Sequence, residues 1–317
     1  MNNQLQTRVY LFTGFLESGK TSFIQDTILN QGFGDDEKTL IIATEDGEES
    51  YDRKALQKEN TEVIFIDNEV DMSYEYLLHL HQQYKPTQVM VEYNGMWDPT
   101  RFINEFCPEQ WQVVQILTTI NADTFDLYYN NMRSQFVFQV TGSDLVIINR
   151  CDEKTKKYPI RGSIKSLNPM CQIIYENKER RIEDLTVNDL PYDLKDDYIE
   201  ISDIDYGIFC MHIMENPAIY ENKTIKIKGK VIGRDKLLKN GFVLGREAMV
   251  CCSEDMQLLG LVCVSEYTQK LIKDEWIIVE GTIALEYDET VQNDIPILYV
   301  DHLEGTVPLK NEYVTFD

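Results

Sequence analysis

Short apolar runs recur along the first half of the chain, and amphipathic stretches separate them. Residues 38–43 and 61–66 are almost continuously apolar, which is typical of strands buried on both faces of a parallel sheet. Further apolar runs lie at 9–12, 88–92, 113–120 and 144–149. Helical patterns lie between some of these runs, at 73–84, 99–107 and 123–138. This alternation predicts right-handed β-α-β crossovers and an open, mostly parallel α/β sheet with helices on both faces.

The pattern changes after residue 180. Residues 181–197 form an acidic stretch with no sustained period, which we interpret as a linker. Beyond it, about five runs alternate apolar and polar positions, as at 224–232 and 275–283, with Gly, Asn and Asp turns between them. Such runs predict a small all-β barrel or sandwich of about 100 residues. We therefore expect two domains, residues 1–180 and residues 198–317.

A glycine-containing loop directly follows the first apolar run. Its sequence, GFLESGKT, fits the pattern G-x-x-x-x-G-K-S/T, and an amphipathic helix follows it. In such a loop backbone N–H groups converge on phosphate oxygens, the lysine adds a cation and the hydroxyl can bind Mg²⁺. A chance turn is the alternative, but the strand–loop–helix setting favours a phosphate-binding loop. The expected contacts come from Gly14, Glu17, Ser18, Gly19, Lys20, Thr21 and Ser22.

Two later stretches supply carboxylates at the ends of predicted strands. The acidic loop 44–52 contains Glu45, a candidate ligand for Mg²⁺ or a candidate to position water. Glu92 ends an apolar strand, where a carboxylate can act on the metal through water, and Gly95 leaves room for a γ-phosphate. A solvated turn and a solvent-facing glutamate are the alternatives. The expected Mg²⁺ site consists of Thr21, Glu45 and Glu92, and the expected catalytic residues are Lys20 and Glu92.

A third stretch, Asn149-Arg-Cys-Asp152, follows a late strand of the same sheet. A carboxylate such as Asp152 can accept the N1–H and N2–H₂ donors of guanine, and Asn149 can brace the loop and meet the acceptors of the ring. Adenine lacks that pair of donors. The sequence therefore predicts GTP, with Mg²⁺, as the nucleotide.

These four motifs together resemble the CobW-type GTPases, which are relatives of HypB and UreG. GFLESGKT corresponds to the family's G-F-L-G-S-G-K-T, Thr44-Glu-Asp-Gly-Glu48 to N-E-x-G-E, Glu92-Tyr-Asn-Gly95 to E-x-S/T-G, and Asn149-Arg-Cys-Asp152 to N-K-x-D. The resemblance covers residues 8 to about 180. It implies a GTPase that couples its nucleotide state to metal delivery or to the assembly of a metalloprotein.

The chain departs from the family pattern at several places. The family's metal-binding C-x-C-C would fall near residues 66–72, where the chain has no cysteine. Glu17 replaces a glycine, and its carboxylate should repel a triphosphate unless it is turned away. Asn121 stands where the family usually has Asp, and Arg150 stands where it has Lys. These departures exclude thiolate coordination at the family's usual place and predict slow or regulatory hydrolysis.

Residues from about 197 onward resemble the C-terminal domain of a bacterial family encoded beside a two-gene permease. The shared segments are a G-x-V strand, the segment R-x-x-M-x-C-C-x-x-D from Arg246 to Asp255, and W-x-x-V-x-G from Trp276. The resemblance implies an oligonucleotide-binding-like barrel and makes a membrane permease a candidate partner.

Cysteine and histidine positions raise the question of a transition metal. Cys251 and Cys252 are candidate ligands for Zn²⁺ or a similar ion, with Asp255 or a remote histidine. Within a strand, however, adjacent side chains point to opposite faces, so one buried thiol with an incidental neighbour is the alternative. His79 and His81, two positions apart on a predicted helix, should not face the same way.

Composition narrows the choice of partner and compartment. The chain carries 30 Lys and Arg against 54 Asp and Glu, a net charge of −24, which argues against nucleic acid or an anionic membrane as partner of the surface at large. No apolar run approaches the roughly 18 residues that cross a bilayer, and the first residues lack signal-peptide features. We expect a cytoplasmic protein whose seven cysteines are free thiols or metal ligands.

Three functions are compatible with the sequence. The first is a GTP hydrolase that couples hydrolysis to a conformational change, in metal homeostasis or metalloprotein assembly. The second is a nucleotide-gated interaction module that scarcely hydrolyses GTP and serves as the cytosolic partner of a permease. The third is a metal carrier that uses Cys251 and Cys252. The oligomeric state cannot be predicted.

Overall fold

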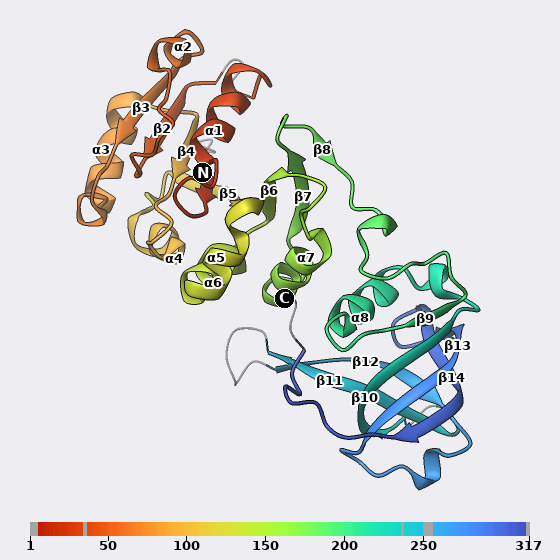
Figure 1. Ribbon diagram of the computed structural model, residues 1–317. Coiled ribbons are helices and arrows are strands. Elements are labelled where there is room, and N and C mark those ends of the chain that lie inside the picture. The colour runs from red at the N-terminus through yellow and green to blue at the C-terminus, as the bar shows by residue number, and fades with distance from the viewer. Residues whose placement is uncertain (1–5, 34–36, 236–237, 250–255, 315–317) are drawn as a thin grey trace. The chain divides into compact units, whose positions relative to one another are not determined.

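The computed structural model describes residues 6–33, 37–235, 238–249 and 256–314. By its internal contacts the chain divides into two compact units, Met1–Thr155 with Leu167–Asp184, and Lys156–Ser166 with Leu185–Asp317. The chain enters the second unit twice, because residues Lys156–Ser166 group with it, and these include all but the last residue of helix α7 (Lys157–Leu167), which Figure 1 labels.

The first unit is built on one sheet with the strand order β3-β2-β4-β1-β5-β6-β7-β8. All neighbours run parallel except β8, which is antiparallel to β7. Strand β1 is central, as expected of the strand that precedes a ligand loop in an open α/β sheet. The strands are β1 (Thr7–Thr13), β2 (Thr39–Ala43), β3 (Thr61–Phe65), β4 (Gln88–Glu92), β5 (Trp111–Asn121), β6 (Leu145–Cys151), β7 (Gln172–Asn177) and β8 (Ile182–Glu183).

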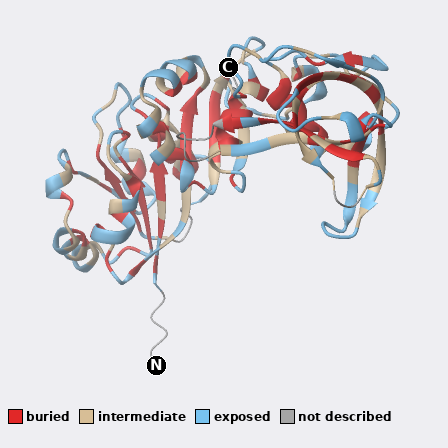
Figure 2. Cartoon of the chain, turned by 90° about the horizontal axis from the view of Figure 1, so that it is seen from below, coloured by how far each residue is buried: buried red, intermediate tan, exposed pale blue. Residues whose placement is uncertain are grey.

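Alternate residues of the central strands pack into two hydrophobic cores, one on each face of the sheet. Val9 and Leu11 share a core with residues of α3 (Tyr74–Tyr84). Phe12 points the other way, into a core with residues of α1 (Lys20–Leu29) and α2 (Arg53–Lys58). Figure 2 shows the strands of this sheet mostly buried. The predicted α/β sheet with helices on both faces is confirmed.

The helices differ from the prediction in two places. The pattern at 99–107 is split into α4 (Pro99–Arg101) and a wider π-helical turn, η2 (Phe102–Phe106). The pattern at 123–138 is interrupted at Met132, whose φ of −131° lies outside helical values. Two helices result, α5 (Phe125–Asn131) and α6 (Arg133–Thr141). The short 3₁₀ turns of the unit are η1 (Glu69–Asp71) and η3 (Ala122–Thr124).

The second unit contains a five-stranded barrel. Its strand order is β11-β12-β14-β13-β10-β9, and β11 also pairs with β10. This additional pairing closes β10–β14 into a barrel, whereas β9 pairs with β10 outside it. Strands β12 and β14 are parallel, and the other four barrel pairs are antiparallel. The strands are β9 (Tyr198–Glu200), β10 (Thr224–Arg234), β11 (Gly241–Met249), β12 (Met256–Val264), β13 (Trp276–Asp288) and β14 (Asn293–Gly305). The predicted small barrel is confirmed.

The core of the barrel follows the alternation seen in the sequence. Ile225, Ile227 and Val231 of β10 are buried, whereas the lysines between them are only half-buried. Helix α8 (Tyr206–Glu215) packs into the same core. The shorter helical turns are η4 (Val187–Asp189), η5 (Pro217–Tyr220) and η6 (Thr268–Lys270). No helix in the described parts of the chain has the length and apolar character needed to span a membrane.

Candidate functional site

The glycine-containing loop lies between the end of β1 and the start of α1, and its backbone requires glycine at two positions. Gly14 has φ 126° and Gly19 has φ 96°, both in the left-handed region. Space is also lacking for a side chain. A Cβ at Gly14 would lie 2.3 Å from the carbonyl oxygen of Thr119, and one at Gly19 would lie 2.7 Å from Nδ2 of Asn149. The loop therefore packs tightly against β5 and β6.

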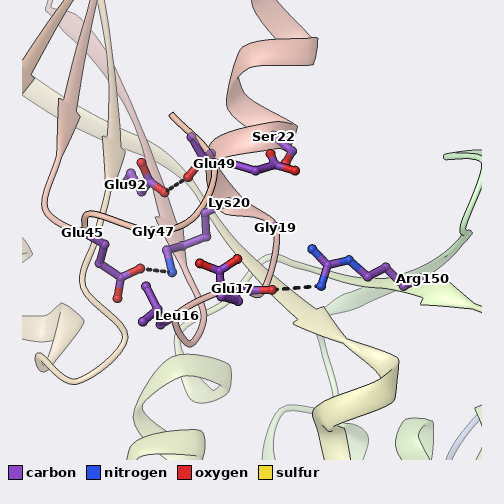
Figure 3. A pocket seen from close by; sticks show the side chains of 11 residues that line it. Leu16, Glu17, Gly19, Lys20, Ser22, Glu45, Gly47, Glu49, Glu92 and Arg150 are labelled. Carbon is purple, nitrogen blue, oxygen red and sulfur yellow. Dashed lines mark hydrogen bonds and ion pairs between the residues drawn. The ribbon is translucent and has the colours of Figure 1, made fainter. Parts of the chain in front are cut away.

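The ammonium group of Lys20 is held inside this loop. Its Nζ donates to the carbonyl oxygens of Gly14 at 2.7 Å and Phe15 at 2.9 Å. It also forms an ion pair with Oε2 of Glu45 at 2.5 Å (Figure 3). The side chain of Lys20 is only 2% exposed. A buried cation requires such partners, so the geometry of the loop and the position of Glu45 depend on each other.

Glu45 connects the acidic loop to the segment after β4. Its Oε1 accepts a hydrogen bond from the N–H of Gly95 at 2.8 Å, while its Oε2 pairs with Lys20. Gly95 lies directly against the phosphate loop, since a Cβ there would be 2.6 Å from the carbonyl oxygen of Gly14. The structure thus brings together three segments that the sequence singled out separately.

Glu92, the last residue of β4, is 2% exposed and accepts two hydrogen bonds. Thr21 Oγ1 donates to its Oε1 at 2.6 Å, and the hydroxyl of Tyr51 donates to its Oε2 at 2.7 Å. Burial raises the pKa of Glu92, and both hydrogen bonds and the charge of Lys20 oppose that rise. Tyr51 was not among the expected site residues, although it lies in the acidic loop 44–52.

Glu17 is turned toward the acidic loop. Its Oε1 accepts a hydrogen bond from the N–H of Glu48 at 2.8 Å. Its carbonyl oxygen accepts another from Nη1 of Arg150 at 3.2 Å. Gly47 leaves the room for this contact, because a Cβ there would be 2.8 Å from the Glu17 carboxylate. The carboxylate of Glu17 therefore accepts a hydrogen bond from the backbone of the acidic loop 44–52.

Asn149 and Asp152 have different surroundings. Asn149 Nδ2 donates to the carbonyl oxygen of Ser18 at 2.7 Å, and its buried Oδ1 has no hydrogen-bond partner among the described residues. Asp152 is part-exposed and forms an ion pair with Lys178 at 2.8 Å, and the hydrogen bond from Lys178 lowers the pKa of Asp152. The structure places Asn149 against the phosphate loop and Asp152 beside Lys178.

Two adjoining hollows lie along these residues. A hollow of about 20 Å³ lies between the phosphate loop and the acidic loop. The second, of about 210 Å³, lies toward the ends of β6 and β7. Asn149 and Lys178 line the larger hollow, whereas Asp152 does not. Residues that line both hollows are Gly19, Ser22, Glu49 and Arg150.

One buried residue joins two of these segments and was not anticipated from the sequence. Gln139 of α6 accepts a hydrogen bond from the N–H of Gly14 at 2.9 Å through its Oε1, and donates one to the carbonyl oxygen of Gly95 at 2.9 Å through its Nε2. The side chain therefore clamps the phosphate loop to the segment after β4. No sequence signal distinguished it from other polar residues of an amphipathic helix.

Some of the candidate transition-metal ligands lie outside the part of the chain that the structure describes. Cys251 and Cys252 lie outside the described ranges. His81 Nδ1 accepts a hydrogen bond from Trp111, and His79 is exposed. Cys263 lies fully buried in the barrel, where burial raises the pKa of its thiol. Within 6–33, 37–235, 238–249 and 256–314, no group of three or more His, Cys, Asp or Glu is arranged to hold a metal ion.

The fold and the loop define a P-loop nucleotide-binding domain. The model of the CobW/HypB/UreG nucleotide-binding domain matches residues 8–175, and the chain belongs to this family. A second family model, the DUF1980 C-terminal domain, matches residues 177–315. The expected family resemblance of both halves is confirmed.

A curated relative from Streptococcus mutans carries the provisional name "two-component membrane permease complex subunit". It is 28% identical over 117 residues, which is 37% of this chain and 40% of that relative, so the match spans less than half of its length. Solved structures similar to the chain include the Zn(II)-bound YjiA GTPase from E. coli, with 16% identity, coverage of 89% of this chain and 87% of that chain, and a TM-score of 0.43. Another is the hydrogenase maturation factor HypB from Archaeoglobus fulgidus, with 15% identity, coverage of 55% and 82%, and a TM-score of 0.39.

Proposed function

We propose that the protein binds GTP with Mg²⁺, hydrolyses it, and couples this cycle to movement of the segments around Glu45 and Gly95. The observation that carries the proposal is the contact at 2.6 Å between Thr21 Oγ1 and Glu92 Oε1 beside the buried Lys20. It places the hydroxyl of a phosphate loop next to a strand-end carboxylate. Hydroxyl and carboxylate oxygens are the ligands that Mg²⁺ prefers.

Each residue of the loop has a role in this proposal. Lys20 and the backbone N–H groups of residues 15–21 hold the β- and γ-phosphates, and the Gly95 N–H faces the γ-phosphate. Thr21 and Glu92, with Glu45 as a further candidate, hold Mg²⁺ directly or through water. Bound Mg²⁺ would neutralise charge that develops on the phosphate oxygens.

The larger hollow is the proposed place of the base. Asn149 lines this hollow, and its buried Oδ1 has no hydrogen-bond partner among the described residues. This oxygen can accept a hydrogen bond, which supports the binding of a ligand that has N–H donors. Asp152 selects guanine in this proposal, and Lys178, which lines the hollow, holds the Asp152 carboxylate in its ionised form. Binding of guanine requires Asp152 to turn toward the hollow.

The test is a calorimetric titration of the full chain with GTP, ATP and XTP, with and without Mg²⁺, combined with a phosphate-release assay. We expect preference for GTP, and loss of phosphate release in Lys20→Ala. Asp152→Asn should shift preference from GTP toward XTP, because an amide N–H₂ can donate to the additional oxygen of xanthine. Preference for ATP by the wild type would refute the assignment of Asn149 and Asp152.

A second candidate function is a nucleotide-gated interaction module that acts with a membrane permease. The similarity to the Streptococcus mutans protein favours it, and so does Glu17, which departs from the family's glycine inside the phosphate loop. Tight GTP binding without Lys20-dependent phosphate release would support this module over the hydrolase. In either case membership of the CobW/HypB/UreG family makes metal homeostasis or metalloprotein assembly the proposed setting.

A further inference from the structure

One carboxylate occupies both of the groups that the proposed function assigns to the γ-phosphate. Glu45 binds Lys20 Nζ through Oε2 at 2.5 Å (Figure 3). Its Oε1 accepts a hydrogen bond from the Gly95 N–H at 2.8 Å. These two donors come from different segments, the start of α1 and the loop after β4. A single anion with two oxygens bridges them.

The surroundings of this bridge are closed. The side chains of Lys20 and Glu45 are 2% and 7% exposed. The hollow beside them measures about 20 Å³, which is room for about one water molecule. A phosphoryl group cannot share this space with the carboxylate, so an anion that binds Lys20 and the Gly95 N–H must displace Glu45.

We propose that Glu45 is an internal competitor of the γ-phosphate, and that it thereby determines how strongly the protein distinguishes GTP from GDP. The inference rests on the proposed function, because it takes the bound nucleotide to be a guanine nucleotide whose phosphates contact Lys20. The carboxylate reproduces the negative charge and the paired acceptor oxygens of a terminal phosphate at these two donors.

The two nucleotides make different demands on the bridge. A diphosphate needs Lys20 but not the Gly95 N–H, so Glu45 keeps the bond from Gly95 and can turn away from Lys20 alone. A triphosphate needs both donors and brings additional negative charge next to the carboxylate. Glu45 therefore weakens binding of GTP more than binding of GDP.

The experiment compares Glu45→Gln with the wild-type full chain by titration with GDP and with a non-hydrolysable GTP analogue, both with Mg²⁺. Glutamine keeps the length of the side chain but loses its charge, so the ion pair with Lys20 is removed. We expect the affinity for the GTP analogue to rise roughly 10-fold, the effect of a charge-assisted hydrogen bond, and the affinity for GDP to change far less.

Glu49→Gln is the control, because Glu49 lines the same hollow and its substitution removes one negative charge while the contacts of Glu45 with Lys20 and Gly95 remain in place. General electrostatic repulsion alone predicts that Glu49→Gln raises the GTP-to-GDP affinity ratio about as much as Glu45→Gln does, because GTP carries more negative charge than GDP. The bridge predicts instead that the ratio changes far more in Glu45→Gln than in Glu49→Gln.

Two results would overturn the inference while leaving the proposed function intact. If Glu45→Gln weakens binding of the GTP analogue, Glu45 acts as a metal ligand and not as a competitor. If it changes both nucleotides equally, Glu45 does not discriminate the γ-phosphate. Absence of guanine-nucleotide binding by the wild type would instead refute the proposed function itself, and the inference with it. Retained GDP affinity shows that the variant is folded.

Discussion

Burial and hydrogen bonding act in opposite directions on the pKa of Glu92. Burial disfavours its charged form and raises its pKa from the usual 4.5, while Thr21 and Tyr51 donate to its two oxygens. The net effect is a carboxylate that takes up a proton at a higher pH than an exposed glutamate. The proposed binding of Mg²⁺ by the charged form of Glu92 should therefore be sensitive to mild acid.

This sensitivity gives the first prediction. The folded chain holds the Glu92 proton more tightly than the unfolded chain, so the free energy of unfolding should fall as pH rises from about 4.5 to the folded pKa of Glu92, and should then level off. Glu92→Gln should remove this slope. Denaturant unfolding across pH 4–8 measures it.

The exposed strand residue Glu62 provides the control, and Glu62→Gln should keep the slope of the wild type. In the wild type, Mg²⁺-dependent nucleotide affinity should fall as pH is lowered through the same range, because the protonated carboxyl no longer attracts the cation. An unchanged slope in Glu92→Gln would show that another group titrates there.

Several site residues could be predicted because strand ends in a parallel sheet meet at one edge. Glu92 ends one apolar strand, and Lys20 and Thr21 follow the loop after another. The structure brings Thr21 into hydrogen-bond contact with Glu92 at this edge of the sheet. Tyr51 and Gln139 could not be predicted. Their positions depend on how a loop and a helix fold over the sheet, which no local pattern records.

At the scale of the elements, helix α6 connects the two loops that surround Lys20. Gln139 satisfies the N–H of Gly14 and the carbonyl of Gly95 with one side chain, and both glycines are buried. Loss of this amide would leave two buried polar groups without partners, and each such group is costly.

We therefore expect Gln139→Leu to lower the free energy of unfolding by about 1–3 kcal/mol and to weaken nucleotide binding, because the phosphate loop and Gly95 are no longer held together. Urea unfolding and titration with the GTP analogue measure the two effects. Gln135→Leu makes the same chemical change on the same helix at a half-buried position and should have little effect on binding. Equal losses in both variants would contradict the clamp.

Elements were predictable where their apolar period was clear. Strand β4 has the bounds expected from the sequence, Gln88–Glu92. Helix α8 was not anticipated because it is apolar almost all round: buried residues occur on every side, so no amphipathic stripe marks it as a helix. Helix α7 was also not predicted, because no helix was assigned between the last predicted strand, which ends at residue 149, and the expected linker, which begins at residue 181.

At the scale of the whole molecule, the chain has separate hydrophobic cores for its two units. Tyr158 of α7 belongs to the core of the barrel unit, and Arg161 of the same helix pairs with Glu215 of α8 at 2.8 Å. A change in composition near residue 180 could be read from the sequence. The long-range contacts of α7 could not, because they depend on packing and not on local pattern.

Separate cores should unfold as separate transitions in calorimetry. Mg²⁺ with the GTP analogue should raise the Tm of the transition of the first unit, because the ligand binds only its folded form. Tyr158→Ala should destabilise the second unit by about 3–5 kcal/mol and lower the Tm of the other transition.

Tyr287→Ala is the control, since Tyr287 is 65% exposed on β13, and it should shift neither transition by more than about 0.5 kcal/mol. A single transition that responds both to the ligand and to Tyr158→Ala would show that the two cores unfold cooperatively.

The pairing of Lys20 with Glu45 also affects how a nucleotide approaches the protein. A phosphate loop usually presents its lysine to solution as an attractive charge, but here that charge is already neutralised, in a molecule of net charge −24. Long-range attraction therefore contributes little to the encounter, and the field of the whole molecule slows it. Added salt screens this repulsion. If the protein binds GTP as proposed, nucleotide capture should therefore be faster at the ionic strength of a cell than in dilute buffer, and the exchange of the Glu45 carboxylate for a phosphate at Lys20 should limit it.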